Sequence, residues 1–265
     1  MDILPSALLG LVQGLTEFIP VSSSGHLILT RELFGIGESS HALAFDAVLQ
    51  LSTALAVGWY FRTELLALGK ALWNKLSGKP VESHQQTLFL ALALGTIPAV
   101  LAGLFLEETM NTVFRSSRLI AWTLIAGALL MFIADRVGKQ GSEINLRQGF
   151  LVGLFQMLAL VPGISRSGAT ISGGLFLGLT RETATRFSFL LGFPILLGSG
   201  LKKLYELWSA NTLVADGAGL LVGSVVAFLS GLAAIHFLVS YLKRRDMTVF
   251  VVYRLLLAAL ILFLL

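Results

Sequence analysis

The sequence has no cysteine and few charged residues. Without cysteine, disulfide bonds and thiolate metal ligands are excluded. Charged residues make up 13% of the 265 residues, whereas soluble domains carry about 25%. Hydrophobic residues make up 55%, which leaves too little polar surface to face water. The composition predicts a membrane protein, and a soluble protein with a very apolar core is the alternative.

Six apolar stretches are long enough to cross ~30 Å of hydrocarbon as helices. They comprise residues 43–61, 86–106, 118–134, 185–204, 216–241 and 248–265. Two further apolar regions, 3–30 and 148–179, are interrupted by polar residues, proline and glycine. Each is predicted to form two short helices joined by a polar turn, buried in protein or lining a wet cavity. The expected fold class is all-α, a polytopic membrane protein with about six transmembrane helices and two re-entrant helix hairpins.

The basic residues predict an orientation. They concentrate in three segments between the spans, residues 62–85, 135–147 and 243–245, which the positive-inside rule places in the cytoplasm. The net charge of +4 is therefore attributed to these loops, and no nucleic-acid partner is expected. When the membrane crossings are counted from these three cytoplasmic segments, the two hairpins enter from opposite faces of the membrane. A full first crossing by the N-terminal segment would change the side of the N-terminus.

An internal repeat agrees with this topology. Four residues recur at a constant offset of 143: Gln13, Ser22, Ser24 and Gly25 reappear as Gln156, Ser165, Ser167 and Gly168. One domain, 1–265, is expected to contain two repeats at approximately 1–135 and 148–265. Each repeat holds one hairpin and three spans, so the second is inverted. Inverted repeats with broken helices place binding sites near the bilayer midplane, between the repeats.

The first hairpin carries an acidic residue and a serine cluster. Gln13 and Glu17 are four residues apart, on one face of a helix. A carboxylate in hydrocarbon is a functional candidate, although a hydrogen bond to another helix or a position outside the bilayer would also explain Glu17. Residues 22–24 are all serine and precede His26. The serines either cap the following helix or supply a hydroxyl nucleophile beside an imidazole.

The second hairpin carries an arginine flanked by small and hydroxyl residues. The guanidinium of Arg166 offers a planar fork of donors to phosphate oxygens. Nearby glycines and the N-terminus of the next helix favour an anion further. The alternative is a salt bridge to Glu17 without a ligand. Arg254, in the last span, is expected to snorkel or to pair, and is given no chemical role.

If the two hairpin tips meet, an acid, a hydroxyl, an imidazole and an arginine share one site. This set suits phosphoryl transfer, and a site inside the bilayer favours a lipid phosphate as substrate. A transporter of an anionic substrate is the main alternative, because carriers also use inverted repeats with half-helices. A structural scaffold would not explain two polar clusters related by a repeat.

The runs Glu17–His26 and Pro162–Thr170 resemble the two signature motifs of bacterial undecaprenyl-diphosphate phosphatase, the family linked to bacitracin resistance. The resemblance covers nearly the whole chain. It implies a multi-pass enzyme of the bacterial plasma (inner) membrane, which converts undecaprenyl diphosphate to undecaprenyl phosphate and inorganic phosphate and so recycles the lipid carrier of cell-wall synthesis. It also implies a site open to the outer, periplasmic face and a divalent cation, Mg²⁺ or Ca²⁺. Expected partners are the polyprenyl diphosphate, membrane lipids and, in a homodimer, a second copy of the chain.

The resemblance also assigns roles to individual residues. Glu17 matches the essential acid and is the candidate metal ligand. Gln13 stands where some members have Glu, which weakens a two-carboxylate metal site. Ser23 matches the nucleophile, His26 the base or an alternative nucleophile, and Arg166 the phosphate-binding arginine; water as the attacking group stays open. The expected substrate-binding residues are Gln13, Ser22, Ser24, Ser165, Ser167 and Thr170.

Overall fold

The computed structural model describes residues 2–36, 40–112, 117–138, 141, 143–209 and 217–264, without the side chains of 40–44, 107–112, 117, 207 and 264. The secondary structure within these ranges is helical, which confirms the all-α, polytopic fold. The helices are α1 (Ile3–Phe18), α2 (Ser23–Phe34), α3 (Ser40–Tyr60), α4 (Arg62–Leu76), α5 (Ser83–Thr112), α6 (Ser117–Val137), α7 (Leu146–Leu158), α8 (Arg166–Phe176), α9 (Arg181–Ser209), α10 (Gly217–Leu242) and α11 (Thr248–Leu264).

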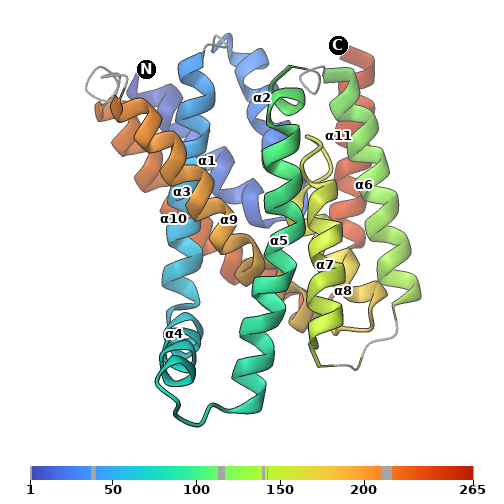
Figure 1. Cartoon of the computed structure of the whole chain (residues 1–265). Helices are drawn as coiled ribbons and strands as arrows, with labels where there is room; N and C mark the ends of the chain where they lie inside the picture. Colours follow the sequence, from blue (N-terminus) through green and yellow to red (C-terminus); the bar gives the residue numbers. More distant parts are fainter. Residues whose placement is uncertain are drawn as a thin grey trace.

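Both interrupted regions form two short helices joined by a turn. Figure 1 shows α1 and α2 entering from the end of the molecule at the top of the view, near both chain termini, and α7 and α8 entering from the bottom. The turns of both pairs lie in the middle of the helix bundle. The two predicted hairpins are therefore present and approach each other from opposite ends.

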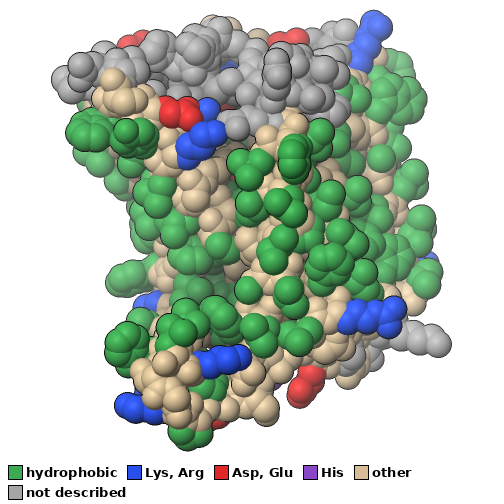
Figure 2. Space-filling view, viewed as in Figure 1, with side chains coloured by type: hydrophobic (Ala, Val, Ile, Leu, Met, Phe, Trp, Pro, Cys, Tyr) green, Lys and Arg blue, Asp and Glu red, His purple; other side chains and the backbone are tan. Residues whose placement is uncertain are grey.

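Helices also cover the six predicted spans. Four are long and apolar enough to cross a bilayer over Ser83–Leu106, Arg118–Val137, Arg181–Glu206 and Gly217–Leu242. The other two are α3 and the shorter apolar helix α11. Figure 2 shows hydrophobic side chains over the middle of one face and Lys and Arg side chains mostly near its ends. Among the exposed hydrophobic side chains, Phe105 and Phe263 are 83% and 90% exposed, as suits contact with lipid tails.

The three basic segments lie at one end of the molecule. Asp135, at the end of α6, accepts hydrogen bonds from Arg181 Nε at 2.6 Å and from Met247 N at 3.0 Å. Glu64 of α4 forms an ion pair with Arg186 of α9. These contacts join α4, the end of α6, the start of α9 and the α10–α11 turn, as the predicted topology requires.

Helix α4 differs from the prediction, which treated residues 62–85 as a loop. Arg62–Leu76 is helical, and Leu66, Trp73 and Leu76 are largely exposed on it beside exposed basic residues. A short helix with apolar and basic residues at its surface is typical of the membrane interface. A search for long apolar runs misses such a helix because its apolar residues are interrupted by charges.

Small residues bring the first arm of each hairpin against a spanning helix. A Cβ at Gly10 of α1 would lie 2.3 Å from Gly223 O of α10, and a Cβ at Gly153 of α7 would lie 2.2 Å from Gly95 O of α5. Such close backbone approach is typical of membrane helix interfaces, where packing and not the hydrophobic effect drives association. These contacts hold α1 and α7, and therefore the turns that follow them.

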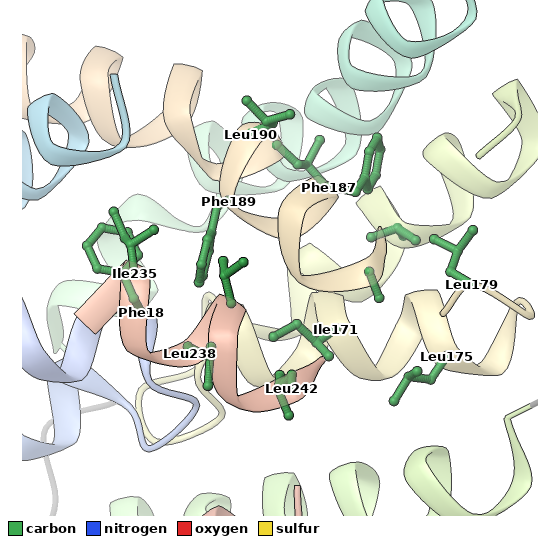
Figure 3. Packing of buried hydrophobic residues seen from close by; sticks show 14 of the residues in the cluster. Phe18, Ile171, Leu175, Leu179, Phe187, Phe189, Leu190, Ile235, Leu238 and Leu242 are labelled. Carbon is green, nitrogen blue, oxygen red and sulfur yellow. The ribbon is translucent and has the colours of Figure 1, made fainter. Parts of the chain in front are cut away.

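A hydrophobic cluster lies next to the turns. Figure 3 shows Phe18 of α1, Ile171 of α8, Phe189 of α9 and Leu238 of α10 among the side chains that converge there. Phe18 and Phe189 pack edge to face with ring centroids 5.2 Å apart. Phe18 directly follows Glu17 in the chain, and the Glu17 side chain is 5% exposed.

Candidate active site

The two turns end in the same unusual backbone conformation. Ser22 caps α2 with φ 76°, and Ser165 caps α8 with φ 74°. The Ser22 hydroxyl accepts a hydrogen bond from Gly25 N at 3.4 Å, and the Ser165 hydroxyl from Gly168 N at 3.2 Å. A positive φ is uncommon for residues other than glycine, and such strain is concentrated at functional sites.

The neighbouring serines are linked to the caps. The Ser22 and Ser24 hydroxyl oxygens lie 3.3 Å apart, and those of Ser165 and Ser167 lie 3.2 Å apart. The hydroxyls at these four predicted substrate-binding positions thus stabilise the two turns. Capping, which the sequence left open, accounts for Ser22 and Ser165 and leaves Ser23 free of that role.

The residues that follow the caps meet at Glu17. Ser23 Oγ donates to Glu17 Oε2 at 2.7 Å, and Arg166 Nη2 donates to Glu17 Oε1 at 2.8 Å in an ion pair. The side chains of Glu17 and Arg166 are 5% and 11% exposed. Ser23 and Arg166 are 143 residues apart, which is the repeat offset. The predicted meeting of the two tips is therefore observed in the positions of these three side chains.

Gln13 completes the environment of the carboxylate. Its Nε2 donates to Glu17 Oε2 at 3.0 Å from one helical turn away. The Gln13 side chain is fully buried, and its Oε1 has no hydrogen-bond partner. An orphaned buried acceptor is costly, so an additional donor or a cation is expected beside it.

The guanidinium of Arg166 lies against the backbone of α9. A Cβ at Gly192 would lie 1.7 Å from Arg166 Nη1 and 2.4 Å from its Cζ. Arg166 Nη1 donates to Ser188 O at 3.4 Å, while Thr170 Oγ1 bonds to Arg166 O at 2.7 Å and to Ser188 Oγ at 2.6 Å. Thr170 and α9 therefore fix the arginine, and Thr170 is directed at protein groups.

His26 contacts a different set of groups. Its Nδ1 lies 2.8 Å from Ser22 O, and because a carbonyl can only accept, Nδ1 is the donor. Its Nε2 lies 2.7 Å from the hydroxyl of Tyr253, whose ring stacks on the imidazole at 5.7 Å between centroids. Both ring nitrogens of His26 therefore have partners other than Ser23, and the base that touches Ser23 is Glu17.

The sequence assigned no role to Tyr253 or Arg254 of α11, and the expectation that Arg254 snorkels is wrong because its side chain is fully buried. Tyr253 holds His26, and Arg254 is fully buried and bonded to backbone carbonyls of both turns. A charged residue within an apolar span is a functional candidate by default, so Arg254 carried a signal. Which groups it contacts depends on how α11 packs against the hairpins, which the sequence does not reveal.

The oxygen atoms around Glu17 test the expected cation. Within the described residues no group of three or more His, Cys, Asp or Glu side chains forms a metal cluster. Glu17, the orphaned Gln13 Oε1 and Ser23 Oγ are nevertheless the hard oxygen donors that Mg²⁺ and Ca²⁺ require. Mg²⁺ is commonly held by one carboxylate together with substrate phosphates. The site therefore fits a cation bound jointly with a diphosphate.

Comparisons with known proteins identify the family of the chain. Residues 6–260 match the family model described as bacitracin resistance protein BacA. The chain is 41% identical over 264 residues to the undecaprenyl-diphosphatase of Marinobacter nauticus, covering 98% of both chains. It is 44% identical over 264 residues to that of Moorella thermoacetica, covering 98% of this chain and 97% of the relative. It is 43% identical over 269 residues to that of Myxococcus xanthus, covering 100% and 90%. The chain belongs to the bacitracin resistance protein BacA family.

Proposed function

We propose that this protein hydrolyses undecaprenyl diphosphate to undecaprenyl phosphate and inorganic phosphate, and so recycles the lipid carrier of cell-wall synthesis. Relatives named undecaprenyl-diphosphatase match it over nearly their whole length. The observation that carries the proposal is the contact of Glu17 with both Ser23 and Arg166 at the meeting point of two buried turns.

Arg166 is proposed to bind the terminal phosphate of the substrate. Helices α2 and α8 begin at Ser23 and Arg166, so two helix N-termini meet at the same point. Their free N–H groups and positive ends favour an anion. In this reading the diphosphate replaces Glu17 as a partner of the guanidinium, which leaves the Glu17 carboxylate available as a base.

Ser23 is proposed to attack the terminal phosphorus. Its proton moves to Glu17 Oε2, with which it is hydrogen-bonded. The bond from Ser23 Oγ to phosphorus forms while the bond from phosphorus to the bridging oxygen breaks, and undecaprenyl phosphate leaves. Water then attacks the phosphorus of the phosphoserine, the bond from phosphorus to Ser23 Oγ breaks, and a proton of the water passes to Oγ, which restores the hydroxyl and releases inorganic phosphate. Arg166 stabilises charge on the transferred group in both steps. His26, held by Tyr253, would manage protons at the edge of the site.

A divalent cation is proposed as a cofactor. Glu17 and Gln13 Oε1 would hold it together with the diphosphate oxygens. When bound, such an ion neutralises charge on the leaving phosphate as a Lewis acid.

The proposed location is the bacterial plasma membrane with the site open to the periplasmic side. The basic segments gather at the end of the molecule opposite to the opening of the α1–α2 hairpin, and the positive-inside rule places that end in the cytoplasm. The helix contacts support the inverted repeat. Helix α1 of the first repeat packs on α10 of the second, and α7 of the second repeat packs on α5 of the first. The repeat and a homodimer stay predictions.

Phosphate release from purified protein tests the proposal. Undecaprenyl diphosphate in detergent is expected to yield inorganic phosphate with Mg²⁺ present, and Arg166→Ala is expected to abolish the release while the protein still elutes as a folded species. A transporter without hydrolytic activity would bind the lipid and release no phosphate. Native-like turnover by Arg166→Ala would contradict the assigned site.

A further inference from the structure

The guanidinium of Arg254 uses all of its hydrogen-bonding capacity on backbone carbonyls. It has five N–H donors and makes five bonds. Nε donates to Leu124 O at 3.2 Å, Nη1 to Pro20 O at 3.2 Å and Ile164 O at 3.0 Å, and Nη2 to Gly163 O at 2.7 Å and Thr123 O at 3.5 Å. In the part of the chain that the structure describes, no carboxylate pairs with this fully buried side chain.

Three of the five acceptors belong to the two turns, and the other two belong to α6. Pro20 lies in the turn between α1 and α2, and Gly163 and Ile164 lie in the turn between α7 and α8. The Ile164 carbonyl immediately precedes Ser165, the cap with positive φ, and Arg166 follows it. One side chain therefore satisfies carbonyls of two irregular segments that would otherwise lack donors away from water.

The neighbourhood of Arg254 is shaped to hold this arrangement. A Cβ at Gly127 of α6 would lie 2.1 Å from Arg254 Nη2 and 2.8 Å from Ile164 O. Thr123, four residues earlier on α6, donates through Oγ1 to Pro162 O at 2.6 Å. Helix α6 thus leaves space for the guanidinium at Gly127 and binds the second turn directly.

We propose that Arg254 is a positioning residue that sets the spacing between the two hairpin tips. Glu17 and Ser23 come from the first hairpin and Arg166 from the second, so this spacing determines the distance from the Ser23 hydroxyl to a phosphate held by Arg166. Burying a charge without a counter-ion is expensive, which is explained if the charge fixes two turns at once. The catalytic consequence rests on the proposed phosphatase function, whereas the spacing itself does not.

Two variants disturb the contact in different ways. Arg254→Lys keeps the charge but has three donors on one nitrogen and cannot reach all five carbonyls. Gly127→Ala keeps Arg254 and pushes its guanidinium away. Both are expected to lower kcat about 10- to 100-fold, since misplacement of reacting groups by about 1 Å costs on that order. Gly69→Ala on α4, where a Cβ meets nothing within 4 Å, is the control with native kcat.

A distance measurement separates positioning from loss of stability. The chain has no cysteine, so spin labels can be attached specifically to Leu15→Cys on α1 and Leu158→Cys on α7, two exposed positions related by the repeat offset. Pulsed electron paramagnetic resonance is expected to give one narrow distance distribution in the otherwise native protein. It should broaden or shift in Arg254→Lys and Gly127→Ala and stay unchanged in Gly69→Ala.

The outcomes are distinct. If the distance distribution between the spin labels is unchanged in folded Gly127→Ala or Arg254→Lys, the proposal is overturned. It is also overturned if the distance distribution changes while kcat stays native. A changed distribution in a protein that releases no phosphate even without substitution would preserve the spacing role and refute the phosphatase function. If Arg254→Lys does not fold, Gly127→Ala decides the question. A variant that is merely less stable would yield less active enzyme, but the distance between the labels in its folded fraction would not change.

Discussion

Replacing Gly192 with alanine tests whether the position of Arg166 controls catalysis. The added Cβ would lie 1.7 Å from Arg166 Nη1 and 2.4 Å from Cζ, whereas ordinary contacts begin at 3.4 Å. The guanidinium must therefore move by about 1.7 Å, or α9 must withdraw by a similar amount. A displacement of about 1 Å is enough to cost on the order of 100-fold in rate.

The expected result is a fall in kcat/KM of about 100-fold, equivalent to about 2.7 kcal/mol of transition-state stabilisation. Alanine has the higher helix propensity, so the exchange favours helix α9 by roughly 0.5–1 kcal/mol. This gain partly offsets the strain of the displaced guanidinium, and a loss of activity in folded protein then reports on Arg166.

Phosphate release in detergent, with substrate varied to obtain kcat and KM, measures the effect. Gly198→Ala is the matched control, because it lies on the same helix and its Cβ would meet nothing within 4 Å. Thermal unfolding of both variants checks the fold. A Gly192→Ala protein with a kcat/KM within about threefold of native would show that the position of the Arg166 guanidinium against α9 is irrelevant to the reaction.

Three further predictions concern the groups around Glu17. Glu17→Gln should lower kcat about 10²- to 10⁴-fold, the range for losing a general base, and a native rate would exclude Glu17 as the base. Ser23→Ala should abolish turnover and also the burst of protein-bound phosphate that we expect on rapid mixing of the native enzyme with substrate, whereas full turnover would indicate that water or His26 attacks phosphorus. Chelation of divalent cations should stop phosphate release, and Mg²⁺ or Ca²⁺ should restore it in native protein; activity that survives exhaustive chelation would refute the joint cation site at Glu17 and Gln13.

Most of the architecture followed from lengths of apolar sequence. A helix must satisfy its own backbone in lipid, so runs such as 86–106 and 216–241 predicted spans directly, and the structure places α5 and α10 there. The polar interruptions at Pro20 and Pro162 predicted the two hairpins for the same reason. Helix α4 was not predicted because an interfacial helix is not required to be uniformly apolar.

The residues of the site were predictable from the sequence, but the hydrogen bonds between them were not. A buried acid and a buried arginine in repeat-related hairpins indicated that Glu17 and Arg166 meet, and they do. The sequence favoured His26 as the base for Ser23 because the two residues are close in the chain. The helical geometry of α2 instead turns His26 to Tyr253 of α11 and leaves Ser23 to Glu17 of α1.

The sequence by itself determined that the chain crosses the bilayer repeatedly, that two segments turn back within it, and which polar residues are buried there. These properties depend on local composition, because lipid penalises every unpaired polar group wherever it occurs. Only the tertiary structure decided which buried groups pair, including the contact of Arg166 with Gly192 and the hydrogen bonds of Arg254 to both turns. Such pairings depend on how closely helices far apart in the sequence approach each other. No local sequence pattern specifies these helix positions.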